Sequence, residues 1–323
     1  MLLRLQPGQP FLVSEAAAAG ITRGALRSMT QSGALRRLLP GVYVDAQVPD
    51  TQLLRANALA RVLTSDAVAC RGTAAWLLGV PVDRLRRAED GAVPVEVCRD
   101  RSTTGVRRQG VRGFVAPLTP NEVLAVHGVP CTSPVRTALD LARWCDRWDG
   151  LAYLDAMVRF GLVSQSDLDS AVPSLEGLPW CEQGRELVGY LDPGAGSAME
   201  SFMRLRYLDA GFPPVETQVP VLDESGLARY FLDCGVREPR FGFEYDGEEF
   251  HGPEQAGHDA ARRLWITQQG WGLEVVRKHL LLARTPEFEC LIGAALGIDP
   301  VILSYEERRR TRLHRKRLRT TAA

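Results

Sequence analysis

The feature that most constrains the fold is a segment rich in proline and glycine, residues 171–196, which ends in LDPGAGS. Proline and glycine interrupt helices and strands, so this segment predicts a boundary between domains. The length of 323 residues also suggests two or three domains. Because 45% of the residues are hydrophobic, each part can bury a core. We therefore expect a multidomain protein that mixes helices and strands, of the α+β or α/β class.

The cysteines favour a reducing compartment. All seven are widely spaced and none forms a CxxC pair, so a zinc site or a disulfide framework is not expected. The N-terminal sequence has no long apolar segment of the kind found in signal peptides, and no apolar run approaches the length of a membrane-spanning helix. We therefore expect a cytoplasmic protein that does not enter a membrane.

Charge is balanced over the whole chain but not along it. The 39 basic and 39 acidic residues cancel, so the net charge gives no information about nucleic acid. Residues 308–319 nevertheless contain eight basic residues and no acid. Two interpretations of this run stay open: a solvated helix end, or a surface that contacts phosphates. We expect residues 306–323 to form a mobile basic tail.

The N-terminal 50 residues predict a helix, a second helix and a hairpin. Residues 11–20 read as a short helix that ends at Gly20. Thr22 can cap a second helix that runs to about Ser32. The dipeptide Pro40-Gly41 then predicts a turn between a basic strand and an apolar one. This order is typical of a winged helix-turn-helix, a DNA-binding fold, which we assign to residues 1–50.

The region 51–180 predicts a second domain of mixed helices and strands. Helices are expected at residues 51–64 and 71–80, and strands at residues 94–100 and 111–116. A further helix begins at about Thr132. Arg136 and Asp140 are spaced to pair on the exposed face of that helix, which is a structural role.

Three stretches of this N-terminal part resemble the abortive-infection type IV antitoxin family, in its actinobacterial form: ITRGALRSMTQSGALRRLLPGVYV, RGTAAWLLGV and GVPCTSPVRTALDLAR. The resemblance implies a winged helix that binds operator DNA and an antitoxin that counters a nucleotidyltransferase toxin. The second helix would then read the major groove and the hairpin would contact phosphates. The DNA-contacting side chains would be Arg23, Arg27, Gln31, Arg36 and Arg37.

From residue 197 to residue 297 the pattern predicts a separate domain in the order α-β-β-β-α-β-α. Ser197 can cap the opening helix and form a capping box with Glu200, three residues later. Three strands follow, then a helix from about residue 253 to 269, a fourth strand and a final helix.

Two acidic residues inside apolar runs are expected to face each other in this domain. If the second hairpin turns between Glu238 and Pro239, Asp233 lies directly opposite Glu244, and Asp246 shares their face. Like charges so placed are unfavourable without a cation or a proton. A divalent metal such as Mg²⁺ or Mn²⁺ would compensate them. The alternative is that these acids are edge-strand charges that face solvent.

Residues 197–296 resemble the PD-(D/E)xK nuclease superfamily, in the branch related to very-short-patch-repair endonucleases. The resemblance is carried by GFPPVETQVPV, FEYDGEEFH and HDAARRLWITQQGW. It implies a restriction-endonuclease-like αβββαβ fold in which Asp233 and Glu244 bind the metal and Glu200 supports them. His251 would be a general base or an outer ligand, with a packing role as the alternative. Arg262 would bind a DNA phosphate, with a purely structural role as the alternative. The candidate catalytic residues are Glu200, Asp233, Glu244, Asp246 and His251.

One departure from the superfamily bears on activity. Its lysine, two residues after the second acid, is replaced here by Asp246. Two functions therefore stay open: a metal-dependent DNA endonuclease, and an antitoxin or repressor whose nuclease-like fold binds DNA or a partner without cutting.

Overall fold

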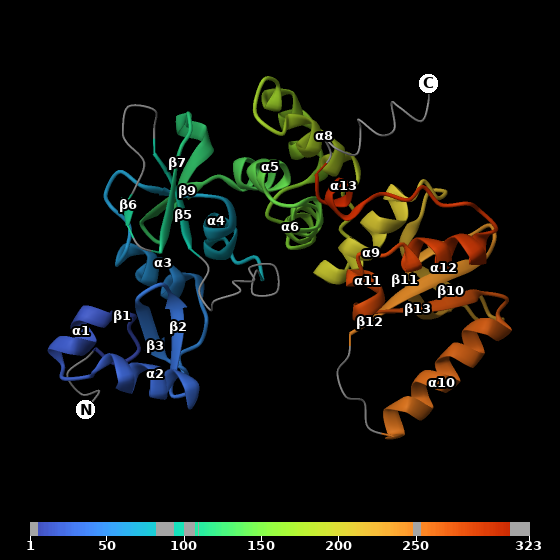
Figure 1. Cartoon of the computed structure of the whole chain (residues 1–323), viewed down its shortest axis with the longest axis horizontal. Coiled ribbons are helices and arrows are strands. Elements are labelled where there is room, and N and C mark those ends of the chain that lie inside the picture. Colours follow the sequence, from blue (N-terminus) through green and yellow to red (C-terminus); the bar gives the residue numbers. More distant parts are fainter. Residues whose placement is uncertain (1–5, 82–93, 100–106, 109, 248–252, 311–323) are drawn as a thin grey trace. The chain divides into compact units, whose positions relative to one another are not determined.

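The structure is a computed structural model that describes residues 6–81, 94–99, 107–108, 110–247 and 253–310 (Figure 1). The chain divides into two compact units, residues 1–141 and residues 142–323. Helices and several separate sheets alternate along the sequence, so the chain is a multidomain protein of mixed α and β structure, as predicted. No helix in the described ranges is long and apolar enough to cross a membrane.

The first unit opens with the predicted helices and hairpin. The second helix is capped by Thr22, whose hydroxyl accepts a hydrogen bond from the backbone N–H of Ala25 at 3.1 Å. The buried core of these first 45 residues is formed by Phe11, Ile21 and Leu26 together with neighbouring apolar residues. A short first strand, which the sequence did not indicate, joins the hairpin in an antiparallel sheet of order β1-β3-β2. The elements are β1 (Phe11–Leu12), α1 (Val13–Ala18), α2 (Arg23–Gln31), β2 (Leu35–Leu39) and β3 (Val42–Asp45).

A six-stranded sheet of order β6-β7-β5-β4-β9-β8 follows in the same unit. The two strands expected from the sequence are β5 (Val95–Arg99) and β7 (Val111–Val115), and they pair in parallel. The expected helices are α3 (Gln52–Ala60), α4 (Arg71–Leu77) and α5 (Pro134–Trp144). The short strands were not anticipated, because two to four residues carry little periodicity; they are β4 (Val68–Ala69), β6 (Arg107–Arg108), β8 (Val123–Val126) and β9 (Val129–Thr132).

The pair formed by Arg136 and Asp140 differs from the prediction. The Nε of Arg136 donates to Asp140 at 2.8 Å, and its terminal nitrogen donates to Glu122 at 2.8 Å. Both members are largely buried: the side chains of Arg136 and Asp140 are only 13% and 9% exposed. The expectation of an exposed pair was wrong, since this arginine ties α5 to the turn before β8.

The second unit begins with a layer of helices, and the proline- and glycine-rich segment 171–196 lies inside this unit. The boundary between the two compact units does not fall in this segment, because buried ion pairs join the residues before it to the residues after it. Arg147 donates to Asp209 at 2.6 and 2.7 Å, and Arg204 donates to Asp155 at 3.0 Å. Each pair links residues on opposite sides of the segment. The helices are α6 (Arg147–Arg159), α7 (Gln165–Ala171) and α8 (Cys181–Gly189).

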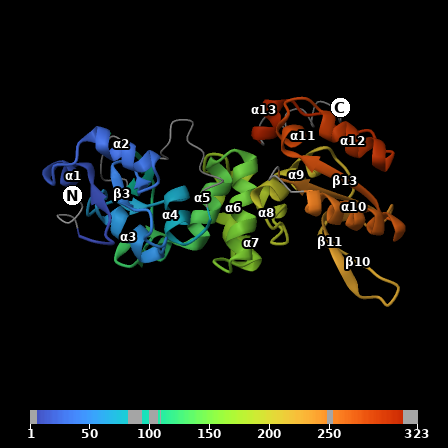
Figure 2. The ribbon, with the colours of Figure 1, turned by 90° about the horizontal axis from the view of Figure 1, so that it is seen from below.

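A four-stranded sheet of order β10-β11-β12-β13 completes this unit, antiparallel except for the last pair. Helices cover it on two faces (Figure 1): α9 and α12 pack on Cys234 and Phe243, whereas α10 packs on Leu232 through Ile266. The predicted order is confirmed, with one extra short helix, α11. The elements are α9 (Ala198–Asp209), β10 (Glu216–Leu222), β11 (Ala228–Val236), β12 (Phe241–Asp246), α10 (Pro253–Gln268), β13 (Gly272–Arg277), α11 (Lys278–Leu282) and α12 (Glu287–Leu296). The β10–β11 hairpin extends beyond the rest of the sheet (Figure 2).

The start of the basic run at residues 308–319 belongs to the folded unit. Arg308, at the end of α13 (Tyr305–Arg309), is 2% exposed and donates to Glu289 at 3.3 Å. Arg309 pairs with Asp146, and Arg310 donates to the carbonyl of Cys145 at 2.8 Å. These three arginines are therefore structural and do not belong to a free basic tail. Residues 311–323 lie outside the described part.

Candidate functional site

Helix α2 presents three polar side chains on one face. Arg23, Arg27 and Gln31 follow one another at intervals of four residues, so they line one side of the helix. All three are exposed, and within the described part of the chain none makes a side-chain hydrogen bond or an ion pair. The opposite face is anchored by Leu26, which is 3% exposed. This exposed face is free to contact a ligand.

The two arginines of strand β2 differ in availability. Arg36 donates to the carbonyl of Val48 at 2.8 Å and lies 3.8 Å from Asp50. Arg37 is exposed and has no such partner among the described residues. Of the two residues expected to contact phosphate, Arg37 is therefore the available one, while Arg36 holds the chain after the hairpin in place.

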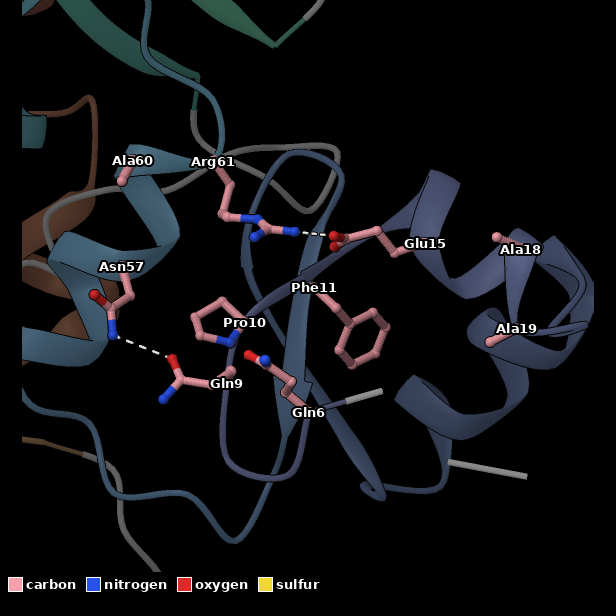
Figure 3. A pocket seen from close by; sticks show the side chains of 10 residues that line it. All are labelled: Gln6, Gln9, Pro10, Phe11, Glu15, Ala18, Ala19, Asn57, Ala60 and Arg61. Carbon is pink, nitrogen blue, oxygen red and sulfur yellow. Dashed lines mark hydrogen bonds and ion pairs between the residues drawn. The ribbon is translucent and has the colours of Figure 1, made fainter. Parts of the chain in front are cut away.

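A cavity of about 790 Å³ lies behind this region (Figure 3). It is lined by the segment before α1 and by α3, and a hydrogen bond between Asn57 and Gln9 of 3.2 Å crosses it. An ion pair between Arg61 and Glu15 lies on its other side. The sequence carried no signal for this cavity, because its lining residues come from 6–19 and from 57–61, which are at least 38 positions apart in the chain.

The register of the β11–β12 hairpin is the one predicted. Cys234 pairs with Phe243, and the two pairs nearer the turn continue that register. The paired stretch ends there, and extending its register by one residue would put Asp233 opposite Glu244. Beyond the paired stretch the side chain of Asp233 links the two strands, since its Oδ2 accepts a hydrogen bond from the N–H of Tyr245 at 2.9 Å. The two acids predicted to share a site are thus adjacent.

Asp233 is an unusual carboxyl group. Burial, reinforced by the negative charges of Glu200 and Glu244, raises its pKa to about 7, although the hydrogen bond from Tyr245 and the charge of Arg262 oppose the rise. A carboxyl group with a pKa near neutrality, repelled by two others, lacks a sufficient counter-charge. Asp233 therefore marks the centre of the acidic site.

The raised pKa of Asp233 predicts a pH-dependent gain in stability for Asp233→Asn. The unfolded chain loses this proton near the ordinary pKa of 3.8 and the folded protein only near 7, so stability falls as pH rises between these values. Each pKa unit is worth ~1.4 kcal/mol; allowing for partial exposure, the variant should be more stable than wild type by roughly 2 kcal/mol at about pH 8 and equal to it at about pH 4.

Urea unfolding at the two pH values measures this difference. Glu224→Gln, at the exposed tip of the β10–β11 hairpin, is the matched control and should change stability by less than about 0.5 kcal/mol at either pH. A loss of stability in Asp233→Asn at about pH 8 would instead make Asp233 a structural residue.

Glu244 is neutralised by an arginine. Two terminal nitrogens of Arg262, on α10, donate to its two carboxylate oxygens at 2.6 and 2.5 Å. Arg262 also donates to the carbonyl of Phe231 at 3.2 Å and lies over the ring of Tyr230, 5.2 Å from its centroid. The residue expected to bind DNA phosphate is thus engaged by the second acid of the site.

The other predicted site residues take different positions. Glu200 accepts a hydrogen bond from the N–H of Gly196 at 2.7 Å, and its own N–H donates to the hydroxyl of Ser197 at 3.2 Å. The capping box therefore closes on Gly196 instead of Ser197. Asp246 lies 3.9 Å from Arg263. His251 lies outside the described residues.

Gln218, in the stretch GFPPVETQVPV that carries the nuclease resemblance, lies next to the acidic site. It lies opposite Asp233 in the β10–β11 register, between the pair of Thr217 with Cys234 and the pair of Val219 with Leu232. Its φ of +49° is in the left-handed region, which is rare for residues other than glycine. Strained backbone of this kind concentrates at functional sites, so the distortion is a feature of the acidic site.

The donor set fits a hard divalent cation with few protein ligands. Within the described ranges, no group of three or more His, Cys, Asp or Glu side chains is arranged to hold a metal ion. Mg²⁺ commonly uses one or two carboxylates together with water and phosphate. Asp233 and Glu244 could supply two such carboxylates, the second of them shared with Arg262.

Two family models match the chain. The one described as "Transcriptional regulator, AbiEi antitoxin" matches residues 1–44, and the one described as "AbiEi antitoxin C-terminal domain" matches residues 67–190. The chain belongs to the AbiEi antitoxin family. Membership confirms the resemblance inferred for the N-terminal part and makes the protein an antitoxin-type regulator.

Proteins of Mycobacterium tuberculosis are similar over most of this chain. "Uncharacterized protein Rv2248", of strain H37Rv, and "Uncharacterized protein MT2308", of strain CDC 1551, are each 33% identical to it over 258 residues, which cover 78% of this chain and 88% of the relative. The crystal structure of the RV2827C protein from the same organism is 17% identical, covers 63% of this chain and 77% of that chain, and superposes with a TM-score of 0.30. A similarity at this TM-score supports no conclusion.

Proposed function

We propose that the protein is an antitoxin-type transcriptional regulator that binds operator DNA through a winged helix-turn-helix formed by residues 11–45. The observation that carries the proposal is the face of α2, where Arg23, Arg27 and Gln31 are exposed together without internal partners. A helix with such a face can enter the major groove, where arginine binds guanine and glutamine binds adenine. By family membership, its protein partner would be a cognate toxin, of the nucleotidyltransferase class.

The hairpin of β2 and β3 would act as the wing. Arg37 is its free cation, so it would contact a phosphate and contribute affinity that does not depend on sequence. Arg36 is held by Val48 and Asp50 and would contribute little to binding.

This difference between the two arginines gives the test. Arg37→Ala should weaken DNA binding about equally for all sequences and lower the salt slope of log affinity by about one unit, since one phosphate contact is lost. Arg36→Ala should leave the slope unchanged. Fluorescence anisotropy over a salt series measures both. Equal slopes for wild type and Arg37→Ala would count against the wing.

A second candidate function is metal-dependent DNA cleavage by the C-terminal domain, and the acidic site favours it. We infer a restriction-endonuclease-like fold of the very-short-patch-repair-like branch from the αβββαβ order and from Asp233 opposite Glu244. Bound Mg²⁺ or Mn²⁺ would activate water and stabilise the leaving oxygen. Asp233 and Glu244 would hold it, Glu200 would support Asp233, and Asp246 stands where the superfamily has lysine.

Plasmid cleavage that requires Mg²⁺ or Mn²⁺, disappears with EDTA and is absent from Asp233→Asn would support this second function. If the wild type does not cut, the domain retains the alternative role of binding DNA or a partner without catalysis.

A further inference from the structure

Arg262 supplies Glu244 with the positive charge that a bound metal ion would otherwise provide. Its two terminal nitrogens contact both carboxylate oxygens at 2.6 and 2.5 Å, the bidentate geometry in which arginine and carboxylate bind most strongly. The carbonyl of Phe231 and the ring of Tyr230 fix the guanidinium from two further sides. Both oxygens of Glu244 are therefore occupied by hydrogen-bond donors.

The neighbouring arginine shows that this contact is specific. Arg263 is 44% exposed, and its nearest acid, Asp246, is 3.9 Å away. Arg262 is 28% exposed and Glu244 only 12%, so their pair is screened much less by solvent. The guanidinium of Arg262 therefore neutralises Glu244, and Arg263, the next residue of α10, does not.

The pair is nevertheless accessible to solvent on the side of Arg262. Within the stretch 257–268 of α10, Ile266 is the one buried residue, and the side chain of Arg262 keeps 28% of its surface exposed. A metal bound by Glu244 would have to share this carboxylate with the guanidinium of Arg262, and the two positive charges would repel each other.

We propose that Arg262 is the internal counter-ion of Glu244 and competes with a divalent metal for it. This inference rests on the second candidate function, because it assumes that Asp233 and Glu244 form a metal site. It assigns Arg262 the role of a positioning residue that limits metal affinity, in place of the phosphate contact expected from the sequence.

Calorimetric titration of the full chain with Mn²⁺, without DNA, tests the competition. Arg262→Ala removes the positive charge that neutralises Glu244, so Mn²⁺ should bind about tenfold more tightly than to wild type, because a like charge no longer opposes the cation. Arg263→Ala is the matched control, one residue away and equal in charge, and should leave the affinity unchanged. Adding Glu244→Gln to Arg262→Ala should remove the gain.

A second variant covers the case in which Arg262→Ala does not fold. Arg262→Lys keeps the charge but cannot hold two oxygens in a fork, so it should also bind Mn²⁺ more tightly than wild type, by a smaller factor. Unchanged or weaker binding in the folded variants, beside a wild type that binds Mn²⁺, would overturn the competition and leave the metal site standing. Absence of Mn²⁺ binding in wild type and variants alike would overturn both.

Discussion

Arg147→Ala should destabilise the second unit by about 3–5 kcal/mol, the usual loss when one partner of a buried ion pair is removed. The guanidinium of Arg147 has no exposed surface and donates to both oxygens of Asp209, at 2.6 and 2.7 Å, and to Glu186 at 2.8 Å. Its removal leaves two buried carboxylates without their donor. It also removes one of the two buried ion pairs that join α6 to α9 and leaves the pair of Arg204 with Asp155 in place.

Chemical unfolding followed by circular dichroism measures this loss. Arg185→Ala is the matched control, because Arg185 lies on exposed α8 surface of the same unit and should change stability by less than about 0.5 kcal/mol. A similarly small change in stability for Arg147→Ala would show that the packing of α6 on α9 does not depend on the ion pair of Arg147 with Asp209.

Local signals made much of this fold predictable. Thr22 caps α2 as expected, because a hydroxyl that bonds the first turn is a strong helix start. The turn at Glu238 and Pro239 fixed the register of β11 on β12, so the approach of Asp233 to Glu244 followed from counting residues. Caps, turns and registers depend on neighbouring residues, and the sequence shows neighbours directly.

The parts that escaped prediction depend on contacts between distant residues. Arg147 and Asp209 are 62 positions apart, and Arg262 and Glu244 are 18 apart. In the sequence Arg147 and Asp209 look like ordinary surface charges, and nothing pairs Arg262 with Glu244, because the partner of a buried charged group is recognisable only once both are placed. The buried ion pairs of Arg147 with Asp209 and of Arg204 with Asp155 join α6 to α9, on the other side of residues 171–196. For the same reason the sequence did not show that Arg36 and Arg308 are bound by internal partners.

Joint replacement of Arg23, Arg27 and Gln31 by alanine should abolish sequence-specific DNA binding. Each good contact between a side chain and a base is worth ~1–3 kcal/mol, so loss of three should lower specific affinity by at least about a hundredfold, to the level of random DNA. The fold should survive, since these side chains are exposed and alanine favours helix.

The most direct test of the account is the affinity of this triple variant for a duplex from the region upstream of its own gene, compared with a scrambled duplex at fixed salt. Fluorescence anisotropy should show that wild type prefers the upstream duplex and that the triple variant binds both duplexes equally weakly, while Arg185→Ala behaves as wild type. A triple variant that keeps the preference of wild type would contradict the account, because the face of α2 would then not be the surface that reads DNA.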